Sequence, residues 1–470
     1  MPRTKKPTRS ELSSTLGASF RDPSGFLFTE GGTLFRQVNH VYAKNYDRLM
    51  ESGLYDKLVK AGLLIPHREV EQAPAEKETA YKILQPELVP FISYPYEWSF
   101  GQYKDAALAM LSIQKRALKA GMSLKDASAY NIQFVHGKSL LIDTLSFEAY
   151  QEGEPWVAYK QFCQHFLAPL ALMALNDVRL SQLMRVYIDG IPLDLASKLL
   201  PFGSRLQFGL LTHIHVHAGA QKRFADAEIA GAKTRGSMSK QSMLGLIESL
   251  QATVKKLEWK AGGTEWGDYY DITNYSEAAF EHKKEIVAGW IERVKPALVW
   301  DLGANNGEFS RIASAAGIYT ISSDIDPAAV EQNYRRVRQE KEENLLPLVL
   351  DLTNPSPALG WANREREAFD QRGPADIIFA LALVHHLAIS NNVPLLRVAE
   401  YFAGLGRWLV VEFVPKSDSQ VKKLLRSRED IFGQYTKEGF EQAFESFYWL
   451  REAIPVCDSE RTLYLYQKRE

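Results

Sequence analysis

One stretch decides the fold of the C-terminal part of this chain: Val299-Trp300-Asp301-Leu302-Gly303-Ala304-Asn305-Asn306-Gly307-Glu308-Phe309. An apolar run enters an acidic residue, then a small-residue turn with two glycines, and then a helix-like segment. Glycine lacks a Cβ, so such a turn brings the backbone close to a bound nucleotide. Asp324 stands 23 positions after Asp301, at the end of the next apolar run, where an acid commonly holds ribose hydroxyls. The pattern predicts an adenosine-cofactor site.

The acid ahead of the turn indicates which cofactor fits. The dinucleotide fingerprint places Gly-x-Gly-x-x-Gly directly after the strand, whereas here Asp301 precedes Gly303-x-Asn305-x-Gly307. A carboxylate at this point pairs with an ammonium group but repels a pyrophosphate. S-adenosylmethionine is therefore favoured over NAD. Asn305 in place of the middle glycine matters little if it takes a left-handed conformation, which Asn tolerates well. It matters if the backbone must pass very close to the cofactor there.

Strand and helix patterns alternate after Ser276, which we expect to cap a helix that Pro296 ends. Further helices are predicted at 327–343 and 393–404. The expected strands are 297–302, 318–323, 347–350, 375–380 and 408–413, followed by a terminal antiparallel hairpin from 448–456 and 462–467. Apolar strands separated by helices predict an α/β fold, a doubly wound and mostly parallel sheet covered on both faces.

Residues 265–470 resemble a class I S-adenosylmethionine-dependent methyltransferase, of Rossmann-like fold, at four successive places. These are Asp301–Gly307, Ser323–Pro327, Asp351-Leu352 and Ala380–Leu387. Within that family, the version with Asn305 resembles a bacterial group related to nodulation proteins. The resemblance implies that Asp301, Gly303, Asn305, Gly307 and Asp324 hold the cofactor and that Asp351 contacts the adenine. It also implies that the last segment faces the transferred methyl group.

His385 and His386 are the candidate catalytic residues, because a hydroxyl or amine acceptor benefits from a nearby general base. Adjacent residues cannot both point into one pocket, so one is expected to face the substrate while the other packs. Both histidines filling space is the competing interpretation. Glu412 ends a strand at the ligand-binding edge, or it is the partner of a nearby cation. The aromatic segment 266–275 either covers the cofactor or packs.

Bulk properties limit the functions open to this protein. At 470 residues, two or three domains are expected. The formal charge of −1 gives no pull towards nucleic acid or membranes, so neither partner is expected. The basic stretch 1–9 has no apolar segment behind it and predicts a short tail rather than a secretory signal. Two separated cysteines, Cys163 and Cys457, fit a reducing cytoplasm with both thiols buried or idle.

The N-terminal half contains a hairpin signal, 132–135 and 139–142 around His136-Gly137. A two-residue loop there sets Asn131 beside Asp143, with Asp126 near, and these oxygen ligands suit Mg²⁺. The pattern resembles the catalytic loop of protein-kinase-like and aminoglycoside-phosphotransferase-like folds, with Asp126 as base and Asn131 and Asp143 as metal ligands. His-Arg before the first Asp is absent, and Thr-Leu replaces the final Phe-Gly. Arg36 stands nearest to the place of the phosphate-binding lysine.

Two domains are therefore predicted, an α+β domain at 1–235 with kinase-like character and a methyltransferase domain at 236–470. A helix at 243–259 is expected to lead into the second. Three alternate histidines, His213, His215 and His217, would share a face on a strand and bind metal, but would spread apart on a helix. The expected reaction is methyl transfer to a small-molecule or glycan hydroxyl or amine. The rivals are a bifunctional enzyme that also transfers phosphate and a non-catalytic adapter that retains an adenosine pocket.

Overall fold

The computed structural model describes residues 15–217, 237–262, 276–426 and 428–470. The chain forms two compact units, the first made of Met1–Tyr96, Gln102–Trp259 and Ala358–Glu367, and the second of Glu97–Gly101, Lys260–Pro357 and Ala368–Glu470. Each unit thus takes in a short segment from within the sequence of the other. The predicted tail at 1–9, the expected junction at 220–235 and the aromatic segment 266–275 lie wholly or almost wholly outside the described residues.

The first unit combines antiparallel strands with helices, as an α+β domain does. Its strands are β1 (Gly25–Glu30), β2 (Thr33–Asn39), β3 (His67–Glu69), β4 (Ala80–Pro86), β5 (Met122–Leu124), β6 (Ile132–Val135), β7 (Lys138–Leu141) and β8 (Phe147–Ala149). Its helices are α1 (Ala43–Glu51), α2 (Leu54–Lys60), α3 (Phe100–Lys119), α4 (Tyr159–Phe162), α5 (Ala168–Leu175), α6 (Leu183–Val186), α7 (Leu193–Leu199), α8 (Phe208–Leu210) and α10 (Lys240–Lys256). α10 belongs to this unit, whereas the sequence pattern predicted it as a lead-in to the second domain.

The first unit contains two tight hairpins, of which the sequence pattern predicted the second. β1 and β2 pair with Glu30 opposite Thr33 across the two glycines, in a four-stranded sheet ordered β1-β2-β4-β3. β6 and β7 pair with Val135 opposite Lys138. Both loop residues, His136 and Gly137, have positive φ, as a tight two-residue hairpin requires. The register brings Asn131 opposite Ile142, whose N–H donates to the Asn131 carbonyl at 2.8 Å.

The second unit alternates strands and helices. Its strands are β9 (Leu298–Leu302), β10 (Tyr319–Asp324), β11 (Leu345–Val349), β12 (Ala375–Ala380), β13 (Gly406–Phe413), β14 (Tyr448–Pro455) and β15 (Thr462–Lys468). Its main helices are α11 (Glu277–Val294), α12 (Ser310–Ala315), α13 (Pro327–Glu340), α14 (Leu395–Leu405), α15 (Ser419–Leu425) and α16 (Lys437–Glu445). The strands form one sheet ordered β11-β10-β9-β12-β13-β15-β14, in which the last two run antiparallel to their neighbours. The mostly parallel sheet and its terminal hairpin confirm the α/β class predicted for the C-terminal part of the chain.

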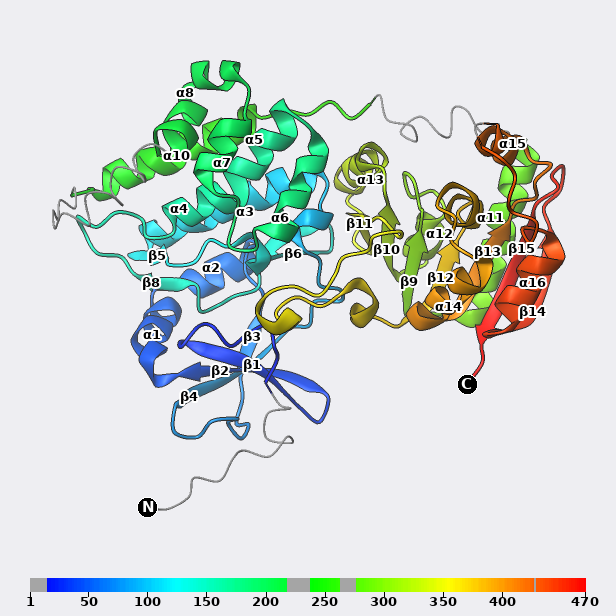
Figure 1. The fold of residues 1–470 in the computed structure, drawn as a ribbon. Coiled ribbons are helices and arrows are strands. Elements are labelled where there is room, and N and C mark those ends of the chain that lie inside the picture. Colours follow the sequence, from blue (N-terminus) through cyan, green and yellow to red (C-terminus); the bar gives the residue numbers. More distant parts are fainter. Residues whose placement is uncertain (1–14, 218–236, 263–275, 427) are drawn as a thin grey trace, which may run out of the picture. The chain divides into compact units, whose positions relative to one another are not determined.

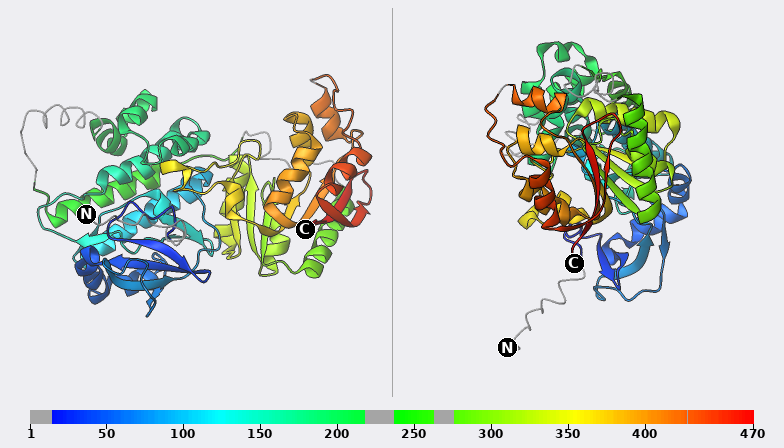
Figure 2. Two further views of the ribbon diagram at one scale, coloured as in Figure 1. Left: turned by 60° about the horizontal axis from the view of Figure 1, so that its bottom comes forward. Right: turned by 90° about the vertical axis from the view of Figure 1, so that its right-hand side faces the viewer.

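Helices lie on both faces of this sheet (Figures 1 and 2), and the side chains of each strand alternate between these faces. Leu463 and Leu465 of β15 join the core beneath α11, together with Trp290 and Ile291 of that helix. Tyr464 lies on the opposite face, with its ring centroid 5.1 Å from that of Phe440 on α16. Both faces of the sheet are therefore buried, which is why its strands read as nearly continuous apolar runs.

Capping residues explain where the helices around the site begin. Ser276 precedes α11, and its hydroxyl accepts the N–H of Ala279 at 3.1 Å. Asp326 precedes α13 and accepts the N–H of Ala328, with Pro327 in the first turn. These caps fit the sequence signals, because a short polar side chain satisfies a backbone donor that the first turn leaves open.

Two further expectations concern membranes and thiols. Within the described part of the chain, no helix is both long and apolar enough to cross a bilayer. Cys163 is buried and its pKa is raised by burial, whereas Cys457 is exposed, so the alternative of burial holds for Cys163 alone. The exposed position follows from the β14–β15 connection, a surface turn after a strand that ends at Pro455.

Candidate functional site

A cavity of about 300 Å³ opens at the carboxyl ends of β9, β10 and β12. β10 and β12 pair with β9 on opposite sides, so the chain reverses its direction of winding at β9. Ligands bind at such a switch point in open α/β sheets, because the loops diverge there and leave a crevice. The predicted residues that line it are Asp301, Gly303, Asn305, Asp324, Asp351 and His386.

Asp301 is a buried carboxylate at the end of β9. Its side chain is 1% exposed, and its Oδ2 accepts the Ser310 hydroxyl at 2.6 Å. Burial raises its pKa from 3.8 to about 7, against the opposing effects of the Ser310 hydrogen bond and the Lys283 charge. Asp324 adds to the rise. A buried acid of this kind is stabilised by a cation brought into the pocket.

Asp324, at the end of the neighbouring strand β10, accepts a hydrogen bond from the turn that follows β9. Its Oδ2 accepts the N–H of Asn305 at 2.7 Å, and its Oδ1 accepts the N–H of Asp326 at 2.9 Å. Burial still raises its pKa to about 6 despite these hydrogen bonds. The turn is also hydrogen-bonded to β10, because the N–H groups of Gly303 and Ala304 both donate to the Ser323 carbonyl.

The turn needs glycine at Gly307, where φ is +84°. A Cβ there would lie 2.5 Å from Asn333 Nδ2 and 2.8 Å from Arg311 Nη1. Gly307 itself does not line the cavity. Its role is to let Asn333 and Arg311 pack closely against the turn.

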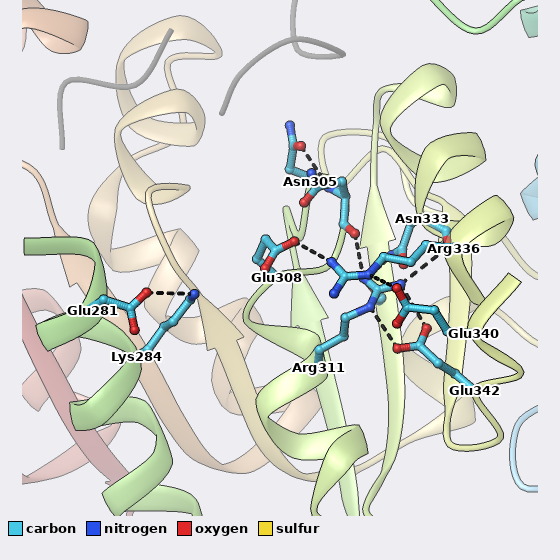
Figure 3. Close-up of polar contacts among 11 residues, drawn as sticks. Glu281, Lys284, Asn305, Glu308, Arg311, Asn333, Arg336, Glu340 and Glu342 are labelled. Carbon is cyan, nitrogen blue, oxygen red and sulfur yellow. Dashed lines mark hydrogen bonds and ion pairs between the residues drawn. The ribbon is translucent and has the colours of Figure 1, made fainter. Parts of the chain in front are cut away.

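Arginines fix the outer side of this turn (Figure 3). Arg311 donates to the Asn306 carbonyl at 2.8 Å and forms a two-pronged pair with Glu342 at 2.8 and 2.9 Å. Arg336 pairs with Glu308 at 2.6 Å. Two-pronged guanidinium–carboxylate pairs hold geometry as well as charge, so the turn is preorganised.

Asn305 has a φ of +53°, the left-handed conformation that the sequence interpretation required. Its side-chain oxygen accepts the N–H of Asn306 at 2.8 Å. This local hydrogen bond is the reason Asn tolerates left-handed backbone better than other residues with a Cβ.

The two adjacent histidines separate as expected. His386 lines the cavity, whereas His385 is 2% exposed and does not line it, with the ring centroids 4.1 Å apart. Burial lowers the pKa of His386 to about 4, and the Arg461 charge adds to this. Burial, then His386, lowers the pKa of His385 well below its usual value. His386 is thus neutral at physiological pH and can accept a proton.

Sequence reasoning missed Lys283, a residue of α11 that lines the cavity. Its ammonium group is buried and lies 2.7 Å from Glu412 Oε2. Glu412, fully buried at the end of β13, also accepts the N–H of Ala382 at 2.7 Å. Arg461 lies 3.7 Å from the other Glu412 oxygen and donates to Asp418 at 2.8 Å. Of the two interpretations of Glu412, the structure supports the partner of a nearby cation.

Glu412 also orders the loop that faces the cavity after β12. Ala382 has a φ of +50°, which a residue with a Cβ rarely adopts. The hydrogen bond to Glu412 holds it there, next to Leu381 and Leu383 in the cavity wall. Lys283 therefore acts on the cavity both directly and through this loop. A buried acid at the end of an apolar strand was the signal that a cation must lie nearby.

The first unit brings its predicted acidic residues together in pairs. Asn131 donates to Asp126 at 3.1 Å, whereas Asp143 pairs with Arg36 and accepts the Ser146 hydroxyl at 2.5 Å. Burial raises the pKa of Asp126, and Asp143 raises it further. Burial also opposes ionisation of Asp143, but the Arg36 charge and the hydrogen bonds from Ser146, Arg36 and the Leu145 N–H together outweigh it and lower that pKa.

No metal centre is found among the residues that the structure describes. Asn131 and Asp143, the predicted Mg²⁺ ligands, are engaged with Asp126 and Arg36 instead, so the Mg²⁺ prediction has no support from this geometry. The histidine row lies on a helical segment (Leu211–Val216), where His213 and His217 both lie against the ring of Tyr159 while His215 bonds to Ser197 and Ser204. His213 bonds to Tyr159 and Ser249. The metal interpretation of this row therefore fails.

Comparison with known proteins identifies the family. The chain is 34% identical over 464 residues to the nodulation protein NoeA of Rhizobium meliloti strain 1021, and the match covers 97% of this chain and 96% of that protein. This chain belongs to the NoeA family. No family model matches the sequence.

Two solved structures resemble parts of this NoeA-family chain. The magnesium protoporphyrin IX methyltransferase from Synechocystis PCC 6803, with bound S-adenosylmethionine, is 14% identical. The match covers 45% of this chain and 87% of the methyltransferase chain, with a TM-score of 0.30. The bifunctional kinase-methyltransferase WbdD is also 14% identical, covering 44% of this chain and 43% of its own, with a TM-score of 0.31.

Proposed function

We propose that the second unit transfers a methyl group from S-adenosylmethionine to a hydroxyl or amine of a small molecule or glycan. The observation that carries the proposal is the pair of buried acids, Asp301 and Asp324, whose pKa values are raised to about 7 and about 6 in one cavity. Two such acids call for a ligand that is cationic at one end and offers hydroxyl donors at another. S-adenosylmethionine has both features.

The cavity residues fit this cofactor. Asp301 would pair with its amino group, Asp324 would accept its ribose hydroxyls, and Asp351 would lie by the adenine. The turn at Gly303 and Asn305 would let the backbone approach. When bound, the cofactor supplies an electrophilic methyl group. A pyrophosphate in the same place would face two carboxylates and be repelled.

His386 would receive the proton that the acceptor loses. Its lowered pKa keeps the imidazole unprotonated but makes it a weak base, which suits a hydroxyl acceptor, because the hydroxyl proton becomes strongly acidic as the oxygen takes the methyl group. Ser390 and Asn391 line the same side of the cavity and offer polar contacts for a hydroxyl-bearing acceptor. Most of the acceleration would come from holding acceptor and donor in line.

Calorimetry with S-adenosylmethionine tests the cofactor site on the full chain. Wild type should bind, and Asp301→Ala should bind at least about tenfold more weakly, because one charge-assisted hydrogen bond contributes about 1.5 to 3 kcal/mol. Equal affinities, or no binding by wild type, would refute the site. A labelled-methyl screen of cell extract then tests transfer. Binding without transfer to any acceptor would favour the non-catalytic adapter.

A second activity, phosphate transfer by the first unit, rests on a separate observation. Asp126, Asn131, Asp143 and Arg36 converge at the open end of the β6–β7 hairpin, as a kinase-like centre would require. The Arg36–Asp143 pair must open before Asp143 can hold a cation. ATP binding with and without Mg²⁺ should be measured on the full chain, since residues 358–367 belong to this unit and a fragment ending at 235 lacks them. Absence of ATP binding would remove this activity.

A further inference from the structure

An exposed apolar surface lies at one end of the first unit, far along the chain from the residues of the proposed site. Leu199, Phe202, Leu206 and Phe208 are 41%, 78%, 81% and 76% exposed. They stand at the end of α7, in the 3-10 turn that follows it and at the start of α8, at the periphery of the unit (Figure 1). We call these four residues the apolar tip. A cluster of this kind marks a binding surface more often than a scattered apolar residue does.

Hydrogen bonds and buried leucines fix the segment that carries the apolar tip. His215 bridges α7 and the following turn, because its Nδ1 lies 2.8 Å from the Ser197 hydroxyl and its Nε2 lies 2.8 Å from the Ser204 hydroxyl. Leu200 and Leu210, on either side of the turn, are buried. The fold therefore holds the tip in its exposed position. His215, one of the three alternate histidines, serves here as a structural hydrogen-bonding residue.

The charges around the tip are mostly positive. The sequence has no Asp or Glu from 195 to 217, whereas Lys198 and Arg205 are exposed within that stretch. α10 packs against α8, with a Cβ on Gly209 falling 2.0 Å from the Thr253 hydroxyl, and exposes Lys255 and Lys256 in its last turn. Among the described residues that directly flank these two segments, Asp194, which lies 3.8 Å from Lys198, and Glu258 are acidic.

We propose that the apolar tip docks this protein on an anionic lipid bilayer. Exposed Phe and Leu side chains reach the boundary between head groups and acyl chains, while nearby Lys and Arg meet the anionic head groups. Charge argues against a second copy of the chain as the occupant. A symmetric dimer through this surface would place the same cations opposite each other, and their repulsion opposes association.

Vesicle co-sedimentation of the full chain tests the proposal. Wild type should bind vesicles of phosphatidylcholine with a quarter phosphatidylglycerol and should release as salt is raised, because exposed charges are screened. The triple variant Phe202→Ser, Leu206→Ser, Phe208→Ser should lose about tenfold or more in affinity. The control Val41→Ser, Leu88→Ser removes two apolar side chains that are equally exposed in the same unit, 73% and 69%, and should bind as wild type does.

Three results would overturn the proposal. They are no binding of wild type to the anionic vesicles, equal binding by the triple variant and wild type, and equal losses in the triple variant and the control. Sedimentation without lipid distinguishes the other occupant. If wild type self-associates without binding vesicles and the triple variant is monomeric, the surface joins two copies and the lipid proposal is wrong. Thermal melting of each variant checks that its fold is intact.

Discussion

Replacing Asp301 by Asn should stabilise the ligand-free protein while it weakens cofactor binding. The reason is burial. The ionised carboxylate is costly at 1% exposure, and its pKa rises from 3.8 to about 7. At 1.36 kcal/mol per pKa unit, this rise corresponds to about 4 kcal/mol. Asn has nearly the same shape and can still accept the Ser310 hydroxyl, but it carries no charge.

The effect has a defined dependence on pH. Between pH 3.8 and about 7 the folded protein keeps the Asp301 proton that the unfolded chain has released. The contribution of Asp301 to the stability of the folded protein is therefore fully present below pH 4 and is lost as pH rises towards 7. The free energy of unfolding of Asp301→Asn should exceed that of wild type by about 2 kcal/mol at pH 5 and by about 4 kcal/mol at pH 8.

Urea unfolding of the ligand-free chain at pH 5 and pH 8 measures this difference. Trp300, fully buried beside Asp301 on β9, contributes to the fluorescence signal of the second unit. Asp370→Asn, at an exposed acid of the same unit, is the matched control and should show no such gain. A less stable Asp301→Asn at pH 8, or a gain that does not change with pH, would refute the assignment of a buried, protonated acid.

Three further predictions concern the rest of the site. Glu412→Gln should lower the free energy of unfolding in urea by about 3 kcal/mol or more, because it removes the buried negative charge that faces Lys283 and Arg461; an unchanged midpoint would contradict the network. Gly307→Ala should destabilise by about 2 kcal/mol or more, whereas Asn305→Gly should stay within about 1 kcal/mol of wild type; equal effects would disprove the role of Gly307. His386→Ala should lower methyl transfer about a hundredfold with S-adenosylmethionine affinity within about twofold, measured by turnover and calorimetry; a matching loss of affinity would assign His386 to cofactor binding.

Local sequence predicted a tight turn after β9 and the separation of the two histidines. It left the conformation of Asn305 open between two cases, and adjacency did not say which of His385 and His386 faces the cavity. The turn and the separation both depend on interactions within a few residues. The strand bounds were also close, because both faces of the sheet are covered and each strand is apolar throughout.

Long-range contacts account for what the sequence did not reveal. Lys283 stands on the amphipathic helix α11, where a lysine normally indicates the solvated face. Its partner Glu412 is 129 residues away. The exchange of 97–101 and 358–367 between the units was equally hidden, since Glu97 pairs with Arg372 across 275 residues. The apolar tip escaped notice because the charge of −1 averages over the whole chain, whereas docking depends on local charge.

Charge balance within the second unit says more about the ligand than the glycine count does. Around the cavity lie the buried acids Asp301, Asp324 and Glu412 and the buried cations Lys283 and Arg461. Each cation is within 4 Å of Glu412, and Arg461 also reaches Asp418. Asp301 and Asp324 line the cavity, and the Lys283 charge only partly offsets the burial of Asp301. Burial raises the pKa values of both acids, and a cationic ligand would favour their ionised forms. A site built for an anionic cofactor would have distributed these charges the other way.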